Sequence, residues 1–180
     1  MPARSRLLAA LPVLLGTILS GALHGAPAAA QQPPAGQRYG DWMLTCPPAP
    51  PAAGGSGCLL VQRHVAEDTG LDLLGAAIYF RPGQEQATIQ LRVAPQAAQE
   101  EPIGLRVDAA ARLEIDIGRC TEGYCAAAGT LTPDLLQKFK AGRQAAVDFM
   151  IADLGQRLVI PLSLAGFTDA FAALERRKGG

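Results

Sequence analysis

The sequence predicts an all-β sandwich with two short helices. At least seven short segments are apolar or alternate between apolar and polar residues, and turn residues separate them. This pattern is typical of two antiparallel sheets packed face to face. Helical spacing of apolar residues appears in only two segments, both in the last third of the chain. The four cysteines are an even number, which fits a domain stabilised by two disulfides.

The first 30 residues are typical of a cleaved export signal. Arg4 and Arg6 form a basic head, residues 7–23 are mostly apolar, and three alanines at positions 28–30 suit a cleavage site. A membrane anchor needs about 20 apolar residues, whereas this run is shorter and contains a proline and a glycine. We therefore expect a signal peptide at residues 1–30 and a periplasmic or secreted protein.

The mature chain is expected to have a flexible lead at residues 31–40 and a single β-sandwich domain at residues 41–177. Removing Arg4 and Arg6 takes the basic count from 16 to 14 against 16 acids, so the net charge changes from 0 to −2. Basic residues cluster only at positions 176–178, so nucleic acid is not expected as a partner. No second apolar run is long enough for an integral membrane span.

Cys46, Cys58, Cys120 and Cys125 are expected to form the two disulfides. The most local pairing joins Cys46 to Cys58 around a loop rich in proline and glycine, and Cys120 to Cys125 across a short turn. The first bridge would stabilise the fold by about 3 kcal/mol and the tighter second one by less. Cross-pairing that ties two sheets together is the alternative. A structural zinc needs two closely spaced pairs of reduced cysteines. Cys46 and Cys58 are not closely spaced and the chain is expected to be exported, so disulfides are favoured over zinc. No metal and no other cofactor is expected.

Four strands are expected in the first half of the mature chain. One of them places Trp42, Leu44 and Cys46 on the same face, and the fourth alternates without interruption. Trp42 is the only tryptophan, and we interpret it as a core residue packed near a disulfide. The four segments are residues 40–46, 58–65, 71–80 and 87–93.

A hairpin is expected next, between residues 103–107 and 113–117, because both segments alternate. Pairing Val107 with Leu113 keeps every apolar side chain on one face, whereas a slip of one residue would expose them. Opposite charges across a strand pair add a few tenths of a kcal/mol each. This register gives two such pairs, Arg106 with Glu114 and Asp108 with Arg112.

Two short helices are expected in the last third of the chain. The first begins after Thr132, which suits an N-cap, has a proline at its first position, and ends at Gly142. The second covers residues 168–177, with Phe171 and Leu174 facing inward.

Another hairpin is expected between these helices. Its strands alternate at residues 147–151 and 158–162. Pairing Ile151 with Leu158 leaves a two-residue turn, 154–155. Pro161 places the last strand at an edge or at its own end, because proline cannot donate to a sheet ladder.

The mature chain resembles the invasion-associated locus B family of exported bacterial proteins. The matching pieces occur in the family's order and cover nearly all of residues 42–174. One departure is Tyr124, which precedes the last cysteine at a position where a glycine is expected. The pieces are residues 40–42 before Cys46, the second cysteine Cys58, residues 102–105, the pair Cys120 and Cys125, and residues 162–170.

This resemblance implies an immunoglobulin-like antiparallel β-sandwich in the periplasm or outside the cell. The family takes its name from the promotion of host-cell invasion by one pathogen, and it also occurs in bacteria that invade nothing. The resemblance supplies no catalytic residue.

Few residues of the mature chain suit catalysis. His64 is its only histidine, and Ser56 and Ser163 are its only serines. A serine nucleophile needs a base within hydrogen-bond distance, and no local pattern provides one. The adjacent carboxylates Glu100 and Glu101 would point to opposite faces of a strand, so we interpret them as a solvated turn. No catalytic, cofactor-binding or metal site is therefore predicted.

Two hypotheses follow for the function. The first is a non-catalytic envelope protein that binds an unknown protein partner in the envelope or on a host cell, linked to invasion or to envelope function. The second is a periplasmic hydrolase whose site forms only in the folded chain. A concave site that gathers His64, Ser163 and a carboxylate would favour the hydrolase. An apolar patch or an open strand edge would favour binding.

Overall fold

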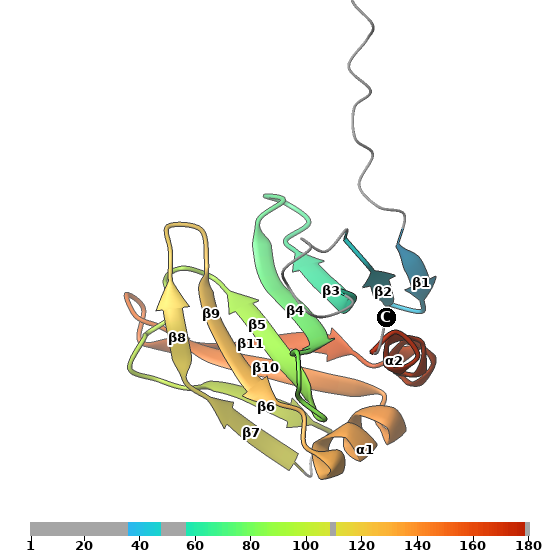
Figure 1. Ribbon diagram of the computed structural model, residues 1–180. Helices are drawn as coiled ribbons and strands as arrows, with labels where there is room; N and C mark the ends of the chain where they lie inside the picture. Colours follow the sequence, from blue (N-terminus) through green and yellow to red (C-terminus); the bar gives the residue numbers. More distant parts are fainter. Residues whose placement is uncertain (1–35, 48–56, 109–110, 179–180) are drawn as a thin grey trace, which may run out of the picture. The chain divides into compact units, whose positions relative to one another are not determined.

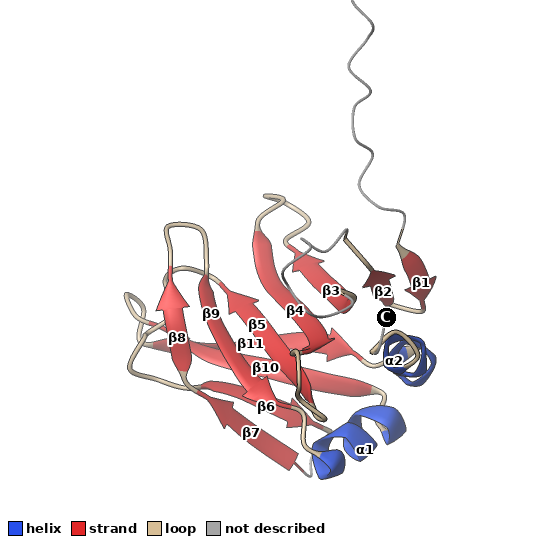
Figure 2. Ribbon diagram, viewed as in Figure 1, coloured by secondary structure: helices blue, strands red, loops and turns tan. Residues whose placement is uncertain are grey.

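The computed structural model describes residues 36–47, 57–108 and 111–178, which belong to one compact unit, Gln32–Gly180. Two antiparallel sheets and two short helices make up these residues, so the predicted all-β sandwich is confirmed (Figures 1 and 2). The signal peptide predicted at residues 1–30 lies outside the described residues.

The larger sheet has seven strands in the order β1-β2-β3-β4-β5-β9-β8. The alternate residues of its central strands are buried, and Leu60, Ile78 and Ile89 are fully inaccessible. These side chains define the inner face, which covers the second sheet. The strands are β1 Gln37–Tyr39, β2 Trp42–Thr45, β3 Leu59–Val65, β4 Asp72–Phe80, β5 Ala87–Val93, β8 Ile117–Cys120 and β9 Cys125–Thr130.

The smaller sheet has four strands in the order β11-β10-β6-β7. β10 and β11 run across behind the strands of the larger sheet (Figure 2), and side chains such as Leu105 and Val147 are buried between the two layers. Pro161 lies in β11, at the edge of the sheet, as predicted. The strands are β6 Ile103–Val107, β7 Ala111–Ile115, β10 Gln144–Ile151 and β11 Gln156–Ser163.

Both predicted helices are present. α1, Pro133–Ala141, begins at the predicted N-cap, where the Thr132 hydroxyl accepts the Leu135 N–H at 3.3 Å. α2, Phe167–Glu175, packs against β1, β2 and β3 at one end of the sandwich (Figure 1). Its first residue, Phe167, meets the Trp42 ring edge-on at 5.4 Å between centroids. Among the described residues, no helix has the length and apolar character needed to cross a bilayer.

Two glycine turns meet where β1 and α2 come together. Gly40 and Gly166 both have positive φ, 56° and 79°, a conformation that costs glycine little. A Cβ on Gly40 would collide with the carbonyl of Ala165, and a Cβ on Gly166 would collide with the carbonyl of Tyr39. The Asp41 N–H also donates to the Ala165 carbonyl at 3.2 Å. The two turns can approach this closely only without side chains.

The first hairpin pairs in a register two residues away from the prediction. β6 and β7 align Leu105 with Leu113, rather than Val107 with Leu113. A shift of two residues keeps the apolar side chains on the inner face. It does, however, set Arg106 opposite Arg112 instead of Glu114. The two predicted charge pairs across this hairpin were therefore wrong.

The turn and a neighbouring strand together account for this register. Asp108 adopts φ 46° directly after β6, and aspartate tolerates this left-handed conformation better than most residues. The turn therefore starts one residue earlier than predicted. The facing arginines, Arg106 and Arg112, both contact the carboxylate of Asp148 on β10, which offsets their repulsion.

The second hairpin also pairs two residues away from the prediction. Ile151 lies opposite Gln156, and Phe149 lies opposite Leu158. The predicted two-residue turn would have placed Leu154 at a position that requires positive φ, a costly conformation for leucine. The four-residue turn observed here needs positive φ only at Gly155, where φ is 58°.

Three further differences concern strands near the chain's turns. Within residues 31–40, predicted as a flexible lead, Gln37–Tyr39 forms β1 because it pairs with β2. The predicted strand 113–117 is divided, since the chain leaves the smaller sheet at Asp116 and joins the larger one as β8. β9 was not predicted, because its run of alanines carries little alternation.

The predicted disulfides are confirmed. Cys46 is bonded to Cys58, next to the paired ends of β2 and β3, and Cys120 is bonded to Cys125 across the turn between β8 and β9. The cross-paired alternative is excluded.

Candidate binding surface

His64 and Ser163, considered above as a possible base and nucleophile, both contact Gln62. Gln62 is 7% exposed, and its amide oxygen lies 3.3 Å from the His64 Nε2 atom. The same oxygen accepts the Ser163 N–H at 2.9 Å, while the Gln62 Nε2 atom donates to the Ser163 carbonyl at 3.0 Å. The Trp42 Nε1–H donates to that carbonyl at 3.0 Å. Side chains of the larger sheet therefore bind the main chain at the end of β11.

This cluster engages the Ser163 main chain rather than its hydroxyl. The hydroxyl oxygen accepts the Ala165 N–H at 3.2 Å, which stabilises the turn before α2. No hydrogen bond described here joins His64 to a carboxylate. The arrangement fastens the two sheets together and does not assemble the nucleophile, base and acid that a serine hydrolase requires. Ser56, the other serine of the mature chain, lies outside the described residues.

The paired carboxylates also lie apart from any catalytic arrangement. Glu100 and Glu101 occupy a turn before β6, and Glu101 binds Arg157 at 3.0 Å. Because all four cysteines are bonded in disulfides, they are not available as metal ligands. In the described part of the chain, no three of the remaining histidine and carboxylate side chains gather as a metal site.

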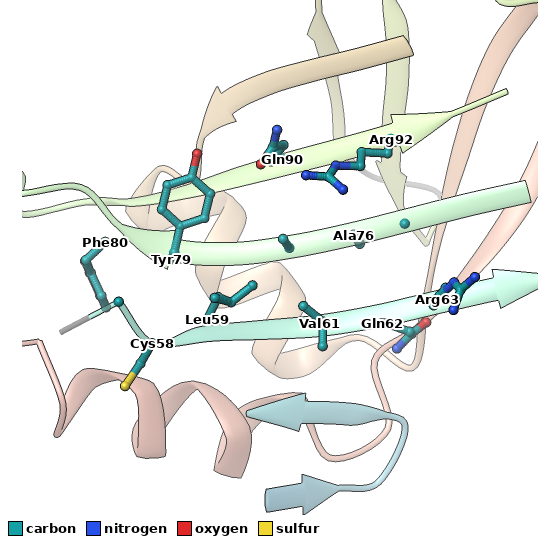
Figure 3. Close-up of a pocket in the computed structure, with 13 residues that line it drawn as sticks. Cys58, Leu59, Val61, Gln62, Arg63, Ala76, Tyr79, Phe80, Gln90 and Arg92 are labelled. Atoms are coloured by element: carbon teal, nitrogen blue, oxygen red, sulfur yellow. The ribbon is translucent and has the colours of Figure 1, made fainter. Parts of the chain in front are cut away.

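Within the described residues, a hollow of about 530 Å³ lies on the outer face of the larger sheet. β3, β4 and β5 form it (Figure 3). The side chains concerned alternate with the buried ones, so they point away from the core. Leu59 and Val61 on β3 and Gln90 on β5 form its sides, and Tyr79 stands at one end (Figure 3). We call this feature the outer hollow.

Small residues in β4 create the outer hollow. The outward positions in the middle of this strand are Gly75 and Ala77, between strands that carry larger side chains. A Cβ at Gly75 would come no closer than 3.7 Å to its nearest neighbour, the Cβ of Arg92. Nothing in the packing therefore forbids a side chain at Gly75. The floor is open because the sequence places small residues there.

Arginines border the outer hollow at the end opposite Tyr79 (Figure 3). Arg63 forms a two-point ion pair with Asp72, one arm of which is 2.7 Å long. These hydrogen bonds raise the pKa of Arg63 above its ordinary value. The Arg92 guanidinium lies over the Tyr124 ring, 4.7 Å from its centroid. Arg92 forms no ion pair among the described residues, so its charge remains available to a ligand.

The outer face of the smaller sheet presents a different arrangement of charge. The Asp148 side chain is only 2% exposed and contacts three arginines. Two further carboxylates, Glu114 and Glu101, bind the same arginines at 3.1 and 3.0 Å. Three cations therefore face three anions. The arginines are Arg106 at 3.5 Å, Arg112 at 3.0 Å and Arg157 at 2.8 Å.

Gly104 makes room for this network. A Cβ at this position would lie 2.5 Å from the Asp148 Oδ1 atom and 2.7 Å from the Arg112 Nη2 atom. Hydrogen bonds to Glu114, and then to Asp148, raise the pKa of Arg112 despite its partial desolvation. A raised arginine pKa stabilises the fold at every pH below the ordinary arginine value, and the contribution is lost only above it. Arg112 therefore remains a cation at neutral pH.

Comparison with known proteins decides the family. The family model described as invasion associated locus B (IalB) protein matches residues 42–175. This chain belongs to the IalB family. The crystal structure of invasion associated protein B from Bartonella henselae is similar to it, with a TM-score of 0.68 and 19% sequence identity, covering 79% of this chain and 96% of that chain. At that identity the likeness concerns the fold alone. A search of curated proteins finds no match.

The structure gives physical roles to several residues of the IalB-like pieces. Trp42 binds Ser163, Gly104 makes room for Asp148, and Gly166 packs against the turn that contains Gly40. These roles belong to the fold. The outer hollow was not predicted, although the alternation of Gly75, Ala77 and Tyr79 in one strand is a signal that could have indicated it. The disulfides and the membership of the IalB family suggest a location outside the cytoplasm.

Proposed function

We propose that this IalB-family chain is a non-catalytic protein of the bacterial envelope, periplasmic or secreted, that binds a protein partner through the outer hollow. The observation that carries the proposal is the hollow itself, which combines apolar walls with the cation of Arg92, for which the described part of the chain supplies no ion-pair partner. An apolar depression with a few polar groups at its rim is the usual form of a binding site.

The export part of the proposal is supported by the leader at residues 1–30 and by the two disulfides. A link to invasion or to envelope function is supported by the family description. Neither the family nor the structural neighbour is described as an enzyme. The chain would act without a metal or another cofactor.

Site-specific crosslinking in the bacterium that produces the chain tests this function. A photoreactive residue replaces Ala77, on the floor of the outer hollow, and the control replaces Glu114, on the outer face of the smaller sheet. We expect the Ala77 position to capture one discrete envelope protein, identified by mass spectrometry, and the Glu114 position not to capture it. Absence of capture, or the same products from both positions, would contradict the proposal.

Mass spectrometry of the processed chain tests the export step. A mature protein that begins at Gln31 is expected in the periplasm or the medium, with both disulfides formed. A full-length chain retained in the cytoplasm with four free thiols would rule out the proposed location, whatever the crosslinking shows.

A further inference from the structure

We propose that the partner presents an acidic peptide segment, with an apolar side chain that enters the outer hollow and carboxylates that bind Arg92 and Arg119. This inference rests on the proposed function and specifies the chemistry of the partner. The observation that supports this inference is the order of side chains across the outer face of the larger sheet.

A row of residues crosses five strands of this sheet at one level. Successive pairings in the ladders join Arg63 to Gly75, Gly75 to Arg92, Arg92 to Ala126 and Ala126 to Arg119. Residues paired across strands share a face. Three arginines on alternate strands therefore share the outer face, with glycine or alanine between them. We call this set, Arg63, Arg92 and Arg119, the arginine row.

The spacing of the arginine row suits a peptide. Neighbouring strands lie about 4.8 Å apart, so arginines on alternate strands have backbones about 10 Å apart. An extended peptide advances about 3.3 Å per residue, and every second side chain lies on the same face. Acidic residues two or four apart in such a segment therefore lie about 7 or 13 Å apart on one face. Because arginine side chains are long and flexible, such a pair can reach Arg92 and Arg119 together.

The charge on the arginine row is only partly balanced. Asp72 pairs with Arg63, whereas neither Arg92 nor Arg119 forms an ion pair with any residue that the structure describes. The stack of Arg92 on Tyr124 orients its guanidinium without neutralising it. Two cations beside an apolar depression are complementary to a ligand that carries carboxylates next to an apolar group.

The placement of the apolar groups favours a peptide over a lipid surface. Membrane-binding faces insert protruding apolar side chains into the headgroup region. In this chain, Leu59, Val61 and Ala77 line a depression, so they can receive a side chain but cannot enter a bilayer.

Nuclear magnetic resonance titration of the exported chain tests the inference with three synthetic peptides. The first is acetyl-Glu-Asp-Phe-Asp-Glu-amide, the second replaces its four acids by lysine, and the third replaces its phenylalanine by glycine. We expect the first peptide to shift backbone amides of β3, β4 and β5 in a saturable way. The lysine peptide should leave these amides unchanged, and the glycine peptide should bind about tenfold more weakly because it buries no apolar side chain.

Variants of the chain locate the contacts. Arg92→Gln and Arg119→Gln should each weaken binding of the first peptide about two- to fivefold, the range for exposed ion pairs. The matched control Arg143→Gln, a charge removed between α1 and β10, should leave binding unchanged. Ala77→Trp should block the outer hollow and abolish the shifts, whereas Ala128→Trp, on the same face but outside the hollow, should retain them. Unchanged folding of each variant is checked from its own spectrum.

Several results would overturn the inference. These are equal binding of the lysine peptide, shifts confined to another face, or affinity unchanged in both arginine variants. Sedimentation of the chain with phosphatidylglycerol vesicles in an Arg92-dependent manner, without any response to the acidic peptide, would assign the row to a lipid surface instead. If the Ala77 crosslinker captures a protein but no acidic peptide binds, the proposed function stands and the acidic chemistry is wrong.

Discussion

The outer faces of the two sheets use arginine in opposite ways. On the smaller sheet, Arg106, Arg112 and Arg157 converge on Asp148, and two more carboxylates complete the balance. On the larger sheet, the arginine row borders an apolar depression and has one carboxylate partner among the residues that the structure describes, Asp72. The first arrangement satisfies its charges within the fold, whereas the second leaves two of them for a ligand. Substitutions on the smaller sheet should therefore change stability, and those on the larger sheet should change binding.

The largest effect is expected from Asp148→Asn. This change leaves three arginines around a neutral side chain, and the free energy of unfolding should fall by about 2–4 kcal/mol. The arginines are 35–45% exposed and keep part of their hydration, which places the loss at the lower end for a buried pair. Urea denaturation measures it. Glu114→Gln, which removes an exposed carboxylate from the same network, should cost less than about 0.5 kcal/mol. Equal losses in the two variants would mean that Asp148 does not organise the network.

Gly104→Ala should have the next largest effect. The added Cβ would collide with Asp148 and Arg112, and relieving such crowding costs about 1–3 kcal/mol. Gly118→Ala in β8 is the matched control, because its Cβ meets only the Ala126 carbonyl oxygen at 3.8 Å. Thermal unfolding of the two variants distinguishes crowding from a general cost of replacing a strand glycine. A stable Gly104→Ala variant would contradict the geometry of the network.

Gln62→Ala should cost about 1–2 kcal/mol, since it removes two hydrogen bonds to Ser163 and leaves the Ser163 N–H without its partner. The carbonyl of Ser163 keeps its bond from Trp42, which limits the loss. Gln90→Ala, on the outer face of the same sheet, should change stability by less than about 0.5 kcal/mol. Hydrogen exchange at the Ser163 amide reports the lost bond directly, and unchanged protection there would refute this role of Gln62.

Arg92→Gln and Arg119→Gln should have the smallest effects on stability. Neither arginine forms an ion pair among the described residues, so Arg119→Gln should stay within about 0.5 kcal/mol of the parent chain. Arg92→Gln also removes the stack on Tyr124, a contact worth about 0.5–1 kcal/mol at an exposed site, and chemical denaturation should show a loss of that size at most. A loss above 1 kcal/mol in either variant would show that the arginine row is structural, and the contrast between the two faces would disappear.

The features that the sequence predicted correctly are local ones, which depend on residues close together in the chain. The N-cap at Thr132, the edge position of Pro161 and the two local disulfides are all confirmed, because each depends on a few adjacent residues. Both hairpin registers were wrong by two residues. The turns are set by whichever residues accept positive φ, Asp108 and Gly155, and alternation of apolar residues cannot distinguish registers that differ by two.

The candidate site could not be predicted from the sequence for a related reason. The arginine row draws its residues from β3, β5 and β8, and only the ladder pairings bring them to one level. Nothing near Arg92 in the sequence indicates that Arg119 shares its face. The floor of the outer hollow is defined by small side chains, and a glycine or alanine within a strand is seldom read as a binding feature.

The close packing of the Gly40 and Gly166 turns affects the order in which the chain forms its disulfides and folds. The Trp42 indole reaches Ser163 across 121 positions, and Gly40 fits only against the turn before α2. The first β-hairpin therefore cannot reach its final packing until the last helix has been synthesised. Cys46 and Cys58, by contrast, are 12 positions apart and can be joined as soon as both have reached an oxidising compartment, before the rest of the chain has folded. The Cys46–Cys58 disulfide should therefore form before β1 and β2 pack against α2. A chain that lacks α2 would keep this disulfide, while Trp42 would stay exposed to water.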